Sequence, residues 1–369
     1  MAACMRTASA NLGGAFAGSA AAGAVVDTGR QAAADLVGGG ANEIAFGPNM
    51  STINVLLAHA VARTLEPGDE ILTTVLDHDA NISPWHQVAA DHGLFVRTVP
   101  VTDPDVTIDL GALEASLSSR TRIVAFTLAS NAVGTVPEAK RIADLAHDAG
   151  ALAWADAVHY APHRRIDVRE LGVDVLLCSP YKFFGPHVGF AWARRQLLEA
   201  WPADRVRAAD ETPPGHRFEL GTQSHEAIAG LTAAVEYVAS LGSGLDRRSR
   251  LDSAFARIQE HEESLARSFL EGLAAIPGVT LHGIADPGRV GERTPTFCLS
   301  IRGHAPRTVA EQFARNGVNV WDGNYYAPDL MTHLGLEGHG GGVRIGFLHY
   351  TAPEEVDRTV TAVRRVAGL

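Results

Sequence analysis

Hydrophobic positions in the first two hundred residues form short apolar runs separated by longer amphipathic stretches. Runs of this length, bounded by turn residues, predict buried strands, and spacings of three and four residues predict helices. The predicted strands are 43–46, 70–76, 94–101, 122–129, 151–159 and 173–178. The clearest predicted helices are 25–36, 53–63 and 137–150. Strands that alternate with helices indicate an α/β domain whose sheet is mostly parallel and covered on both faces.

The pattern changes after about residue 200. A long helical region is predicted over 225–276, and a smaller α/β unit follows it, with strands at 279–282, 296–302, 318–321 and 343–350. We therefore expect a large domain over 1–240 and a smaller C-terminal domain over 241–369. An alternative assigns the N-terminal segment to the smaller domain.

Polar residues recur where the predicted strands of the large domain end. In a parallel sheet these carboxyl ends meet at one edge, and ligands bind there. A single polar residue at a strand end is weak support for a site, but a repeated pattern is hard to explain by folding alone. The residues concerned are His78, Asn131, Asp156, His159, Ser179 and Lys182.

Composition restricts the class of protein. The chain has 369 residues, of which 46% are hydrophobic and 20% charged, which is ordinary for a globular protein. The formal charge of −11 and the lack of basic runs argue against nucleic acid as a partner. No run is long enough to span a membrane, and the Ala/Gly-rich start lacks the apolar core of a signal peptide. Three widely spaced cysteines fit a reducing compartment, so we expect a cytoplasmic protein.

Lysine is unusually rare in this chain. Only Lys140 and Lys182 are present. Lys140 lies in the first turns of an amphipathic helix, where a solvated role is expected. Lys182 follows the strand over 173–178 directly, between aromatic residues and a Gly-Pro break, so it is the candidate if the protein forms a Schiff base. The alternative is a structural lysine whose stem packs along the aromatic side chains.

A second feature is the turn Gly47–Thr52, which joins a strand to an apolar helix. Free backbone N–H groups and the positive end of the helix dipole converge at such a turn and favour an anion. A plainly capped helix explains the same residues. Together with Lys182, and with Asp156 located 26 residues before it, the turn meets the needs of pyridoxal phosphate. That cofactor requires a lysine for its aldehyde, a carboxylate for its ring nitrogen and donors for its phosphate.

The sequence resembles a known family at this point. Six segments carry the resemblance: Asp77–Trp85, Ser130–Thr135, Asp156–His159, Cys178–Lys182, Gly221–Thr222 and Val343–Gly346. In order and spacing they are similar to class V aminotransferases, most closely to the cysteine desulfurase-like branch, and also to isopenicillin N epimerase. The resemblance extends from about residue 10 to 365. It implies the fold type I of pyridoxal-phosphate enzymes, with a large domain containing a mostly parallel central sheet and a smaller C-terminal α/β domain.

The resemblance also implies roles for individual residues. Lys182 would bind the cofactor and move the substrate's α-proton, and His78 would stack on the cofactor ring and act as a catalytic acid or base. Asp156 would pair with the ring nitrogen, and Arg344 would clamp the substrate carboxylate, although a structural arginine is the alternative there. The other implied cofactor contacts are His159, Asn131, Ser179, Tyr181, Asn49, Met50 and Thr222, and the other implied substrate contacts are Asn11 and Tyr326. Thr222 matches a contact supplied by a second subunit, which implies a homodimer.

The sequence departs from the desulfurase pattern in one respect that concerns chemistry. Desulfurases carry a nucleophilic cysteine on a loop of the C-terminal domain, and the matching segment here, Trp321–Ala327, has none. Cys178 and Cys298 fit better as small buried residues. We therefore expect β-elimination, such as C–S cleavage, or desulfurase-like chemistry without the persulfide cysteine, on a small L-amino acid or a cysteine-derived conjugate. Transamination, epimerisation and a non-catalytic scaffold are the alternatives.

Overall fold

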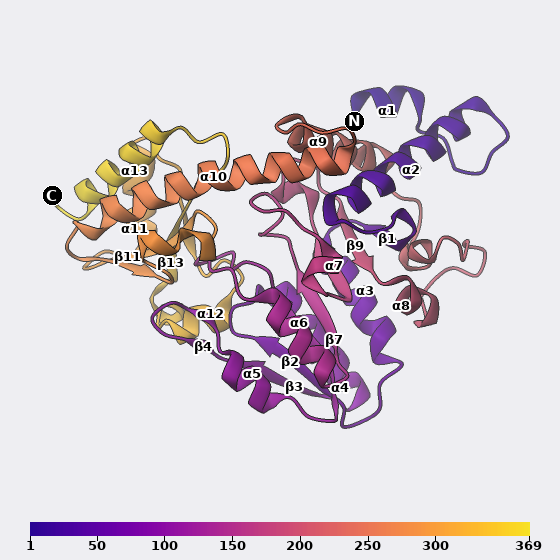
Figure 1. The fold of residues 1–369 in the computed structure, drawn as a ribbon, viewed down its shortest axis with the longest axis horizontal. Coiled ribbons are helices and arrows are strands. Elements are labelled where there is room, and N and C mark those ends of the chain that lie inside the picture. The colour runs from indigo at the N-terminus through magenta and orange to yellow at the C-terminus, as the bar shows by residue number, and fades with distance from the viewer.

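A computed structural model describes residues 1–369 (Figure 1). Its central sheet has seven strands in the order β1-β9-β8-β7-β6-β2-β3. The strands from β8 to β3 are parallel, whereas β9 runs antiparallel to both of its neighbours, β1 and β8. These strands are β1 (Ile44–Gly47), β2 (Glu70–Thr74), β3 (Phe95–Val99), β6 (Thr121–Thr127), β7 (Leu152–Asp156), β8 (Val175–Cys178) and β9 (Gly189–Ala193). The expected mostly parallel sheet is confirmed.

Helices cover both faces of this sheet because its strands alternate their side chains between two apolar cores. In β6, Val124 and Phe126 join one core, and Ile123 and Ala125 join the other. Helices α2, α6 and α9 contribute to the first core, and α3 and α4 to the second. The helices of this part are α1 (Ala2–Thr7), α2 (Ala17–Val37), α3 (Met50–Ala62), α4 (Ser83–His92), α5 (Leu110–Ser116), α6 (Ala139–Asp148), α7 (Val168–Leu171), α8 (Arg195–Ala200) and α9 (His225–Ser240).

A smaller sheet near the C-terminus has the order β10-β11-β13-β12, and all of its pairs are antiparallel. Its strands are β10 (Val279–His282), β11 (Thr296–Ile301), β12 (Trp321–Gly323) and β13 (Gly342–Gly346). The helices of this region are α11 (Pro306–Arg315), α12 (Pro328–His333) and α13 (Pro353–Val366). A short hairpin, β4 (Val101–Thr102) and β5 (Thr107–Ile108), belongs to neither sheet. The domain boundary at residue 240 stays a prediction.

Helix α10 (Arg247–Ala274) runs between the two parts (Figure 1). Phe255 and Ile258 on its first half belong to the core of the large sheet, and Leu265 and Phe269 on its second half belong to the core of the small sheet. At 28 residues the helix is about 42 Å long. It is therefore a rigid rod shared by both cores.

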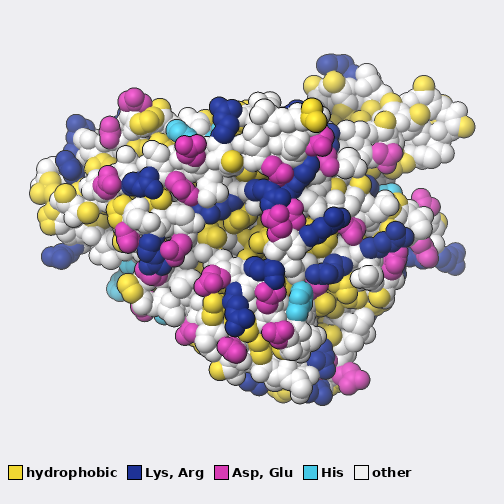
Figure 2. All heavy atoms as spheres, in the orientation of Figure 1, with side chains coloured by type: hydrophobic (Ala, Val, Ile, Leu, Met, Phe, Trp, Pro, Cys, Tyr) yellow, Lys and Arg dark blue, Asp and Glu magenta, His cyan; other side chains and the backbone are white.

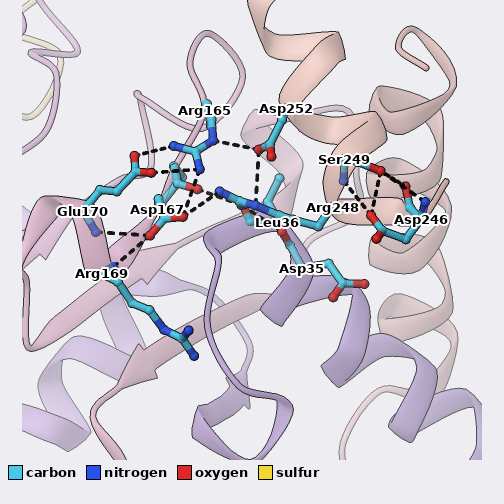
Figure 3. A network of polar contacts seen from close by, with 11 residues as sticks. Asp35, Leu36, Arg165, Asp167, Arg169, Glu170, Asp246, Arg248, Ser249 and Asp252 are labelled. Atoms are coloured by element: carbon cyan, nitrogen blue, oxygen red, sulfur yellow. Dashed lines mark hydrogen bonds and ion pairs between the residues drawn. The ribbon is translucent and has the colours of Figure 1, made fainter. Parts of the chain in front are cut away.

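The structure divides the predicted long helical region into α9 and α10. A Cβ on Gly242 would lie 2.2 Å from the Arg250 carbonyl oxygen, so the connecting loop packs closer to α10 than a side chain would permit. Asp246 then caps α10 by accepting a hydrogen bond from the Ser249 N–H at 2.7 Å. Beyond this cap, a cluster of arginines and carboxylates ties the start of α10 to α2 and α7 (Figure 3).

Charged side chains of both signs alternate over the visible face of the molecule (Figure 2). The N-terminal segment at the upper right carries few charges, and its exposed apolar side chains include Met5, Leu12 and Phe16. None of the helices combines the length and the apolar character that a membrane span needs.

Candidate active site

The carboxyl ends of β2, β6, β7 and β8 place the predicted polar residues along one edge of the large sheet. Asp77 and His78 follow β2, Asn131 follows β6, His159 follows β7, and Ser179 and Lys182 follow β8; Asp156 is the last residue of β7. Strand β13 of the small sheet brings Arg344 to the same place, because its guanidinium donates to the Asn131 carbonyl at 2.7 Å. Residues more than two hundred positions apart thus share one site between the two sheets.

Lys182 ends a single 3₁₀ turn, Pro180–Lys182, directly after β8. Its side chain is exposed and forms neither an ion pair nor a hydrogen bond, and Nζ lies 4.9 Å from the centre of the Tyr181 ring. Surrounding protein and the charge of Arg344 lower the pKa of the ammonium, and the charge of Asp156 opposes them. A lysine with a lowered pKa has a larger neutral, nucleophilic fraction.

Asp156, the last residue of β7, is only 4% exposed. Its Oδ1 accepts a hydrogen bond from the Val158 N–H at 2.8 Å, and Oδ2 has no partner in the protein. Burial raises the pKa of this carboxyl to about 6, against the opposing effects of the Val158 N–H and of Lys182. A buried carboxylate with one free oxygen is suited to a protonated ring nitrogen.

His78 is held as a neutral imidazole. Burial, together with the charges of Lys182 and Arg344, lowers its pKa to about 4, although Asp79 opposes the shift. Nδ1 accepts a hydrogen bond from the Ala80 N–H at 3.0 Å, so the neutral ring carries its proton on Nε2. One face of the ring stacks on Tyr326 at 5.5 Å between centroids.

The turn that contains Tyr325 and Tyr326 joins the small sheet to the site. Both residues have positive φ angles, 58° and 57°, which non-glycine residues rarely adopt. The side chain of Asn131 donates to the Tyr325 carbonyl at 2.8 Å, and the Asp79 N–H donates to the Tyr326 carbonyl at 2.7 Å. These contacts hold the exposed Tyr326 ring beside His78. Conformations of this cost are typical of functional sites.

Arg344 has no acidic partner. Its guanidinium carbon lies 4.6 Å from the centre of the Tyr325 ring, and its one hydrogen bond goes to the Asn131 carbonyl. The Asn131 Oδ1 is buried and has no partner. A half-buried guanidinium without a carboxylate, next to an unpaired amide oxygen, is ready for an anionic ligand that also carries a donor.

The predicted phosphate site is partly closed by the protein itself. The Met50 N–H donates to Ser179 Oγ at 2.9 Å, and the side chain of Asn49 accepts from the Thr52 N–H at 2.9 Å. The hydroxyl proton of Ser179 therefore remains available. Tyr181 is 41% exposed and stacks on His187. The roles of these residues toward a phosphate stay predictions.

Three other predicted residues lie apart from this group or face away from it. Asn11 and Thr222 are exposed and form no hydrogen bond with the strand-end residues; the Asn11 carbonyl accepts from Ser19 Oγ at 2.6 Å. His159 Nε2 lies 2.9 Å from the Thr296 hydroxyl, toward β11. Their roles toward cofactor and substrate stay predictions as well.

Asp77 was not assigned a role from the sequence. It is fully buried, and it accepts hydrogen bonds from the side chains of Asn81, at 2.8 Å, and of Thr74. Burial raises its pKa to about 8; Asn81 and Thr74 oppose that shift, and the charge of Asp156 adds to it. Its position after β2 was the available signal, but only the fold shows that it lies near a second carboxyl.

The cysteines contribute no nucleophile to this site. All three, Cys4, Cys178 and Cys298, are buried and free. Burial raises the pKa of Cys298 to about 12 and that of Cys178 further still. Neither thiol forms a reactive thiolate at neutral pH.

These residues fit pyridoxal phosphate, which would be held by Lys182 at its aldehyde and by Asp156 at its ring nitrogen. The free Lys182 amine, the unpartnered Asp156 oxygen and the unpaired Arg344 support this fit. Together with the mostly parallel sheet and the smaller α/β unit, they define the fold type I class of pyridoxal-phosphate enzymes.

Comparison with known proteins identifies the family. The model of class V aminotransferases matches residues 6–359, so the chain belongs to that family. A cysteine desulfurase of Pectobacterium atrosepticum is 32% identical over 89% of this chain and 79% of its own length. An aminotransferase-like protein of Gibberella zeae is 31% identical over 96% and 86%.

Solved structures agree with this assignment. A cysteine desulfurase of Thermococcus onnurineus, without ligand, superposes with a TM-score of 0.87 at 25% identity, covering 98% of this chain and 88% of the other. The S-sulfonic acid form of a cysteine desulfurase of Escherichia coli gives 0.81 at 25% identity, with the same coverage. Members of this family depend on pyridoxal phosphate.

Proposed function

We propose that this protein is a lyase that uses pyridoxal phosphate to eliminate a β-substituent, such as a thiol, from a small L-amino acid or a cysteine-derived conjugate. One observation carries the proposal: the site keeps Lys182, Asp156 and an unpaired Arg344, but no cysteine lies on the Trp321–Ala327 segment or is exposed elsewhere. Chemistry that starts at the α-carbon is supported, whereas capture of sulfur by a protein thiol is not.

Each residue of the site has a separate role in the proposed reaction. The bound cofactor would supply an electron sink for the substrate's α-carbon. Arg344 would hold the α-carboxylate by a bidentate pair, with the Asn131 amide oxygen near the substrate's donors. Lys182, with its lowered pKa, would accept the α-proton on Nζ. His78, neutral above about pH 4, would lie against the cofactor ring without adding charge.

We further propose a homodimer in the cytoplasm in which Thr222 reaches the site of the other subunit. The exposed position of Thr222 supports this arrangement, and so do the exposed apolar side chains of the N-terminal segment, Met5, Leu12 and Phe16. The proposal gives Asn11, on the same segment, a substrate contact in the partner's site.

The cofactor is tested by absorption of the purified protein after addition of pyridoxal phosphate. Wild type should show a visible band, and Lys182→Ala should lack it. Lys140→Ala is a matched control, because Lys140 is the only other lysine and lies on the surface of α6, and it should keep the band. A colourless wild type would favour a scaffold without catalysis.

The reaction is tested by its products with cysteine, cystine and S-alkyl cysteines. Elimination gives pyruvate and ammonia. Transamination gives pyridoxamine phosphate, and epimerisation gives solvent deuterium at the α-carbon without net product. Alanine together with a persulfide trapped on any cysteine would contradict the proposal.

A further inference from the structure

A buried carboxylate with an unpaired oxygen lies behind the candidate active site. Glu262 is on α10 and is only 3% exposed. Its Oε2 is 2.8 Å from Nδ1 of His163, which is 4% exposed. Its Oε1 is also buried and has no partner in the protein. An unsatisfied carboxylate oxygen in this position is costly unless something occupies the space beside it.

The structure leaves such a space. A cavity of about 10 Å³ is lined by Glu262, His163, Arg164 and Thr294, among others. That volume matches the space that one water molecule requires, and the lining offers the two to four polar partners that a buried water uses. Thr294 is 1% exposed, so its hydroxyl is part of the interior.

Thr294 connects this cavity to the site. Its hydroxyl lies 3.4 Å from His159 Nε2 and 3.3 Å from the Gly134 carbonyl. On the other side, the ring of His163 meets the ring of His159 edge-on at 5.2 Å between centroids. Glu262 thus approaches His159 by two routes, one through His163 and one through the cavity and Thr294.

We propose that the cavity binds one water molecule, and that this water and Thr294 join Glu262 to His159 Nε2, so that Glu262 and His163 are positioning residues for the His159 imidazole. The inference rests on the proposed function only in giving His159 a place beside the cofactor. It assigns a water site and positioning roles to Glu262, on α10, and to His163, in the segment between β7 and α7.

The charges around the site support a neutral His159. Burial and the charges of His163, Arg344 and Lys182 hold its pKa well below the usual value. A neutral imidazole has two tautomers, and the hydrogen bonds at Nε2 decide between them. The Thr296 hydroxyl also lies 2.9 Å from Nε2, so the water and Thr294 would act together with Thr296 to set which nitrogen of His159 carries the proton.

The carboxyl of Glu262 has its own surroundings. Burial raises its pKa, and the charges of His163, Arg164 and His261 oppose that shift. Arg293, which precedes β11, and Glu263, on α10 itself, also line the cavity. The proposed connection holds for either protonation state of Glu262, because Oε1 can accept a hydrogen bond from the water or donate one to it.

Two measurements on the protein without cofactor test the inference. A crystal structure that resolves ordered water should show one water within hydrogen-bond distance of Glu262 Oε1 and Thr294 Oγ1. Nitrogen chemical shifts of the His159 ring should report one dominant tautomer in wild type. Thr294→Val and Glu262→Leu, which remove the hydroxyl and the carboxyl, should each change the tautomer ratio by about fivefold, the size expected for one lost hydrogen bond.

Glu263→Leu is the matched control, since Glu263 lines the same cavity but already accepts from Gln259 at 2.8 Å; it should leave the ratio unchanged. A dry cavity in wild type, or an unchanged ratio in Thr294→Val, would overturn the inference. If Glu262→Leu does not fold, Thr294→Val and the wild-type crystal still decide. Because no cofactor is present, failure of the enzymatic proposal leaves both readouts intact.

Discussion

Two arginine sites in this protein are built in opposite ways. At the start of α10, Arg248 donates to Asp167 at 3.0 Å and to the carbonyls of Asp35, Leu36 and Ile166, and it also pairs with Asp252 (Figure 3). In the candidate active site, Arg344 donates to one carbonyl and lies over one aromatic ring, with no carboxylate. The protein itself supplies hydrogen-bond acceptors and carboxylates for the Arg248 guanidinium, whereas most N–H groups of Arg344 have no partner.

This difference separates structural charge from charge kept for a ligand. Around α10, guanidinium groups and carboxylates compensate one another, since Arg165 pairs with Asp167, Glu170 and Asp252 in the same network. At the strand ends, Asp77, Asp156 and Arg344 are held by neutral groups or by nothing. Removing a charge from the α10 network should therefore lower the free energy of unfolding. Removing a charge from the candidate active site should weaken ligand binding, and it can raise the free energy of unfolding.

The largest effect is expected for Arg344→Gln. The variant loses the proposed bidentate pair with the substrate carboxylate, so kcat/KM should fall by about 100- to 1,000-fold, which corresponds to two charge-assisted hydrogen bonds. Its thermal unfolding should stay close to wild type because no carboxylate loses a partner. Steady-state kinetics and calorimetry on the same preparation measure both.

Arg248→Gln is the matched comparison for Arg344. It should unfold at a lower temperature while the folded fraction keeps its kcat/KM. If the two variants exchange these phenotypes, or if both lose only stability, the distinction between saturated and unsaturated arginines is wrong for this protein.

Much of the fold and part of the site follow from the sequence. Short apolar runs separated by helical spacing are sufficient to predict a mostly parallel sheet, and parallel strands necessarily bring their carboxyl ends together. Lys182, Asp156 and His78 could be selected because each follows or ends such a strand. These inferences depend only on local pattern and on the geometry of a parallel sheet.

Other features depend on contacts that no local pattern contains. The pair His163–Glu262 joins residues 99 positions apart, and the bond from Arg344 to Asn131 joins residues 213 apart. The burial of Asp77 beside a second carboxyl emerges only once β2, β6 and β7 are adjacent. The single helical region predicted over 225–276 is two helices in the structure for a similar reason, since the break between α9 and α10 reflects tertiary packing at Gly242.

The second prediction concerns Asp77→Asn in the cofactor-free protein. The pKa of Asp77 is raised from 3.8 to about 8, so the folded protein retains a proton that the unfolded chain releases. Stability from this group is therefore lost as pH rises from about 4 to about 8. Asparagine mimics the protonated form and does not titrate. The variant should match wild type near pH 4 and gain about 2 to 5 kcal/mol near pH 8, the upper value being the full linkage for a pKa raised from 3.8 to about 8.

Urea unfolding at a series of pH values measures that gain. Asparagine can still accept from Asn81 and donate to the Thr74 hydroxyl, so the geometry is preserved. A variant that is less stable than wild type at pH 8 would show that the folded protein stabilises the charged Asp77 carboxylate. Asp77 would then not differ from the carboxylates of the α10 network.

The smallest effect is expected for Asp167→Asn in the α10 network, and its sign is opposite. Asp167 accepts from Arg165 and from Arg248, both at 3.0 Å, and also caps α7 through the Arg169 and Glu170 N–H groups. Asparagine keeps the cap but loses the charge. The free energy of unfolding should fall by about 1.5 kcal/mol at neutral pH, the range of a charge-assisted hydrogen bond.

Asp204→Asn provides the control for that measurement. Asp204 pairs with Arg63 at 2.9 Å, but its side chain is 55% exposed, and pairs of this kind contribute little. Its substitution should change stability by less than about 0.5 kcal/mol. Equal losses for Asp167→Asn and Asp204→Asn would mean that the network acts as a set of ordinary surface pairs. If Asp167→Asn lowers the free energy of unfolding and Asp77→Asn raises it, the two carboxylates differ in one respect. A guanidinium neutralises the charge of Asp167, and none neutralises that of Asp77.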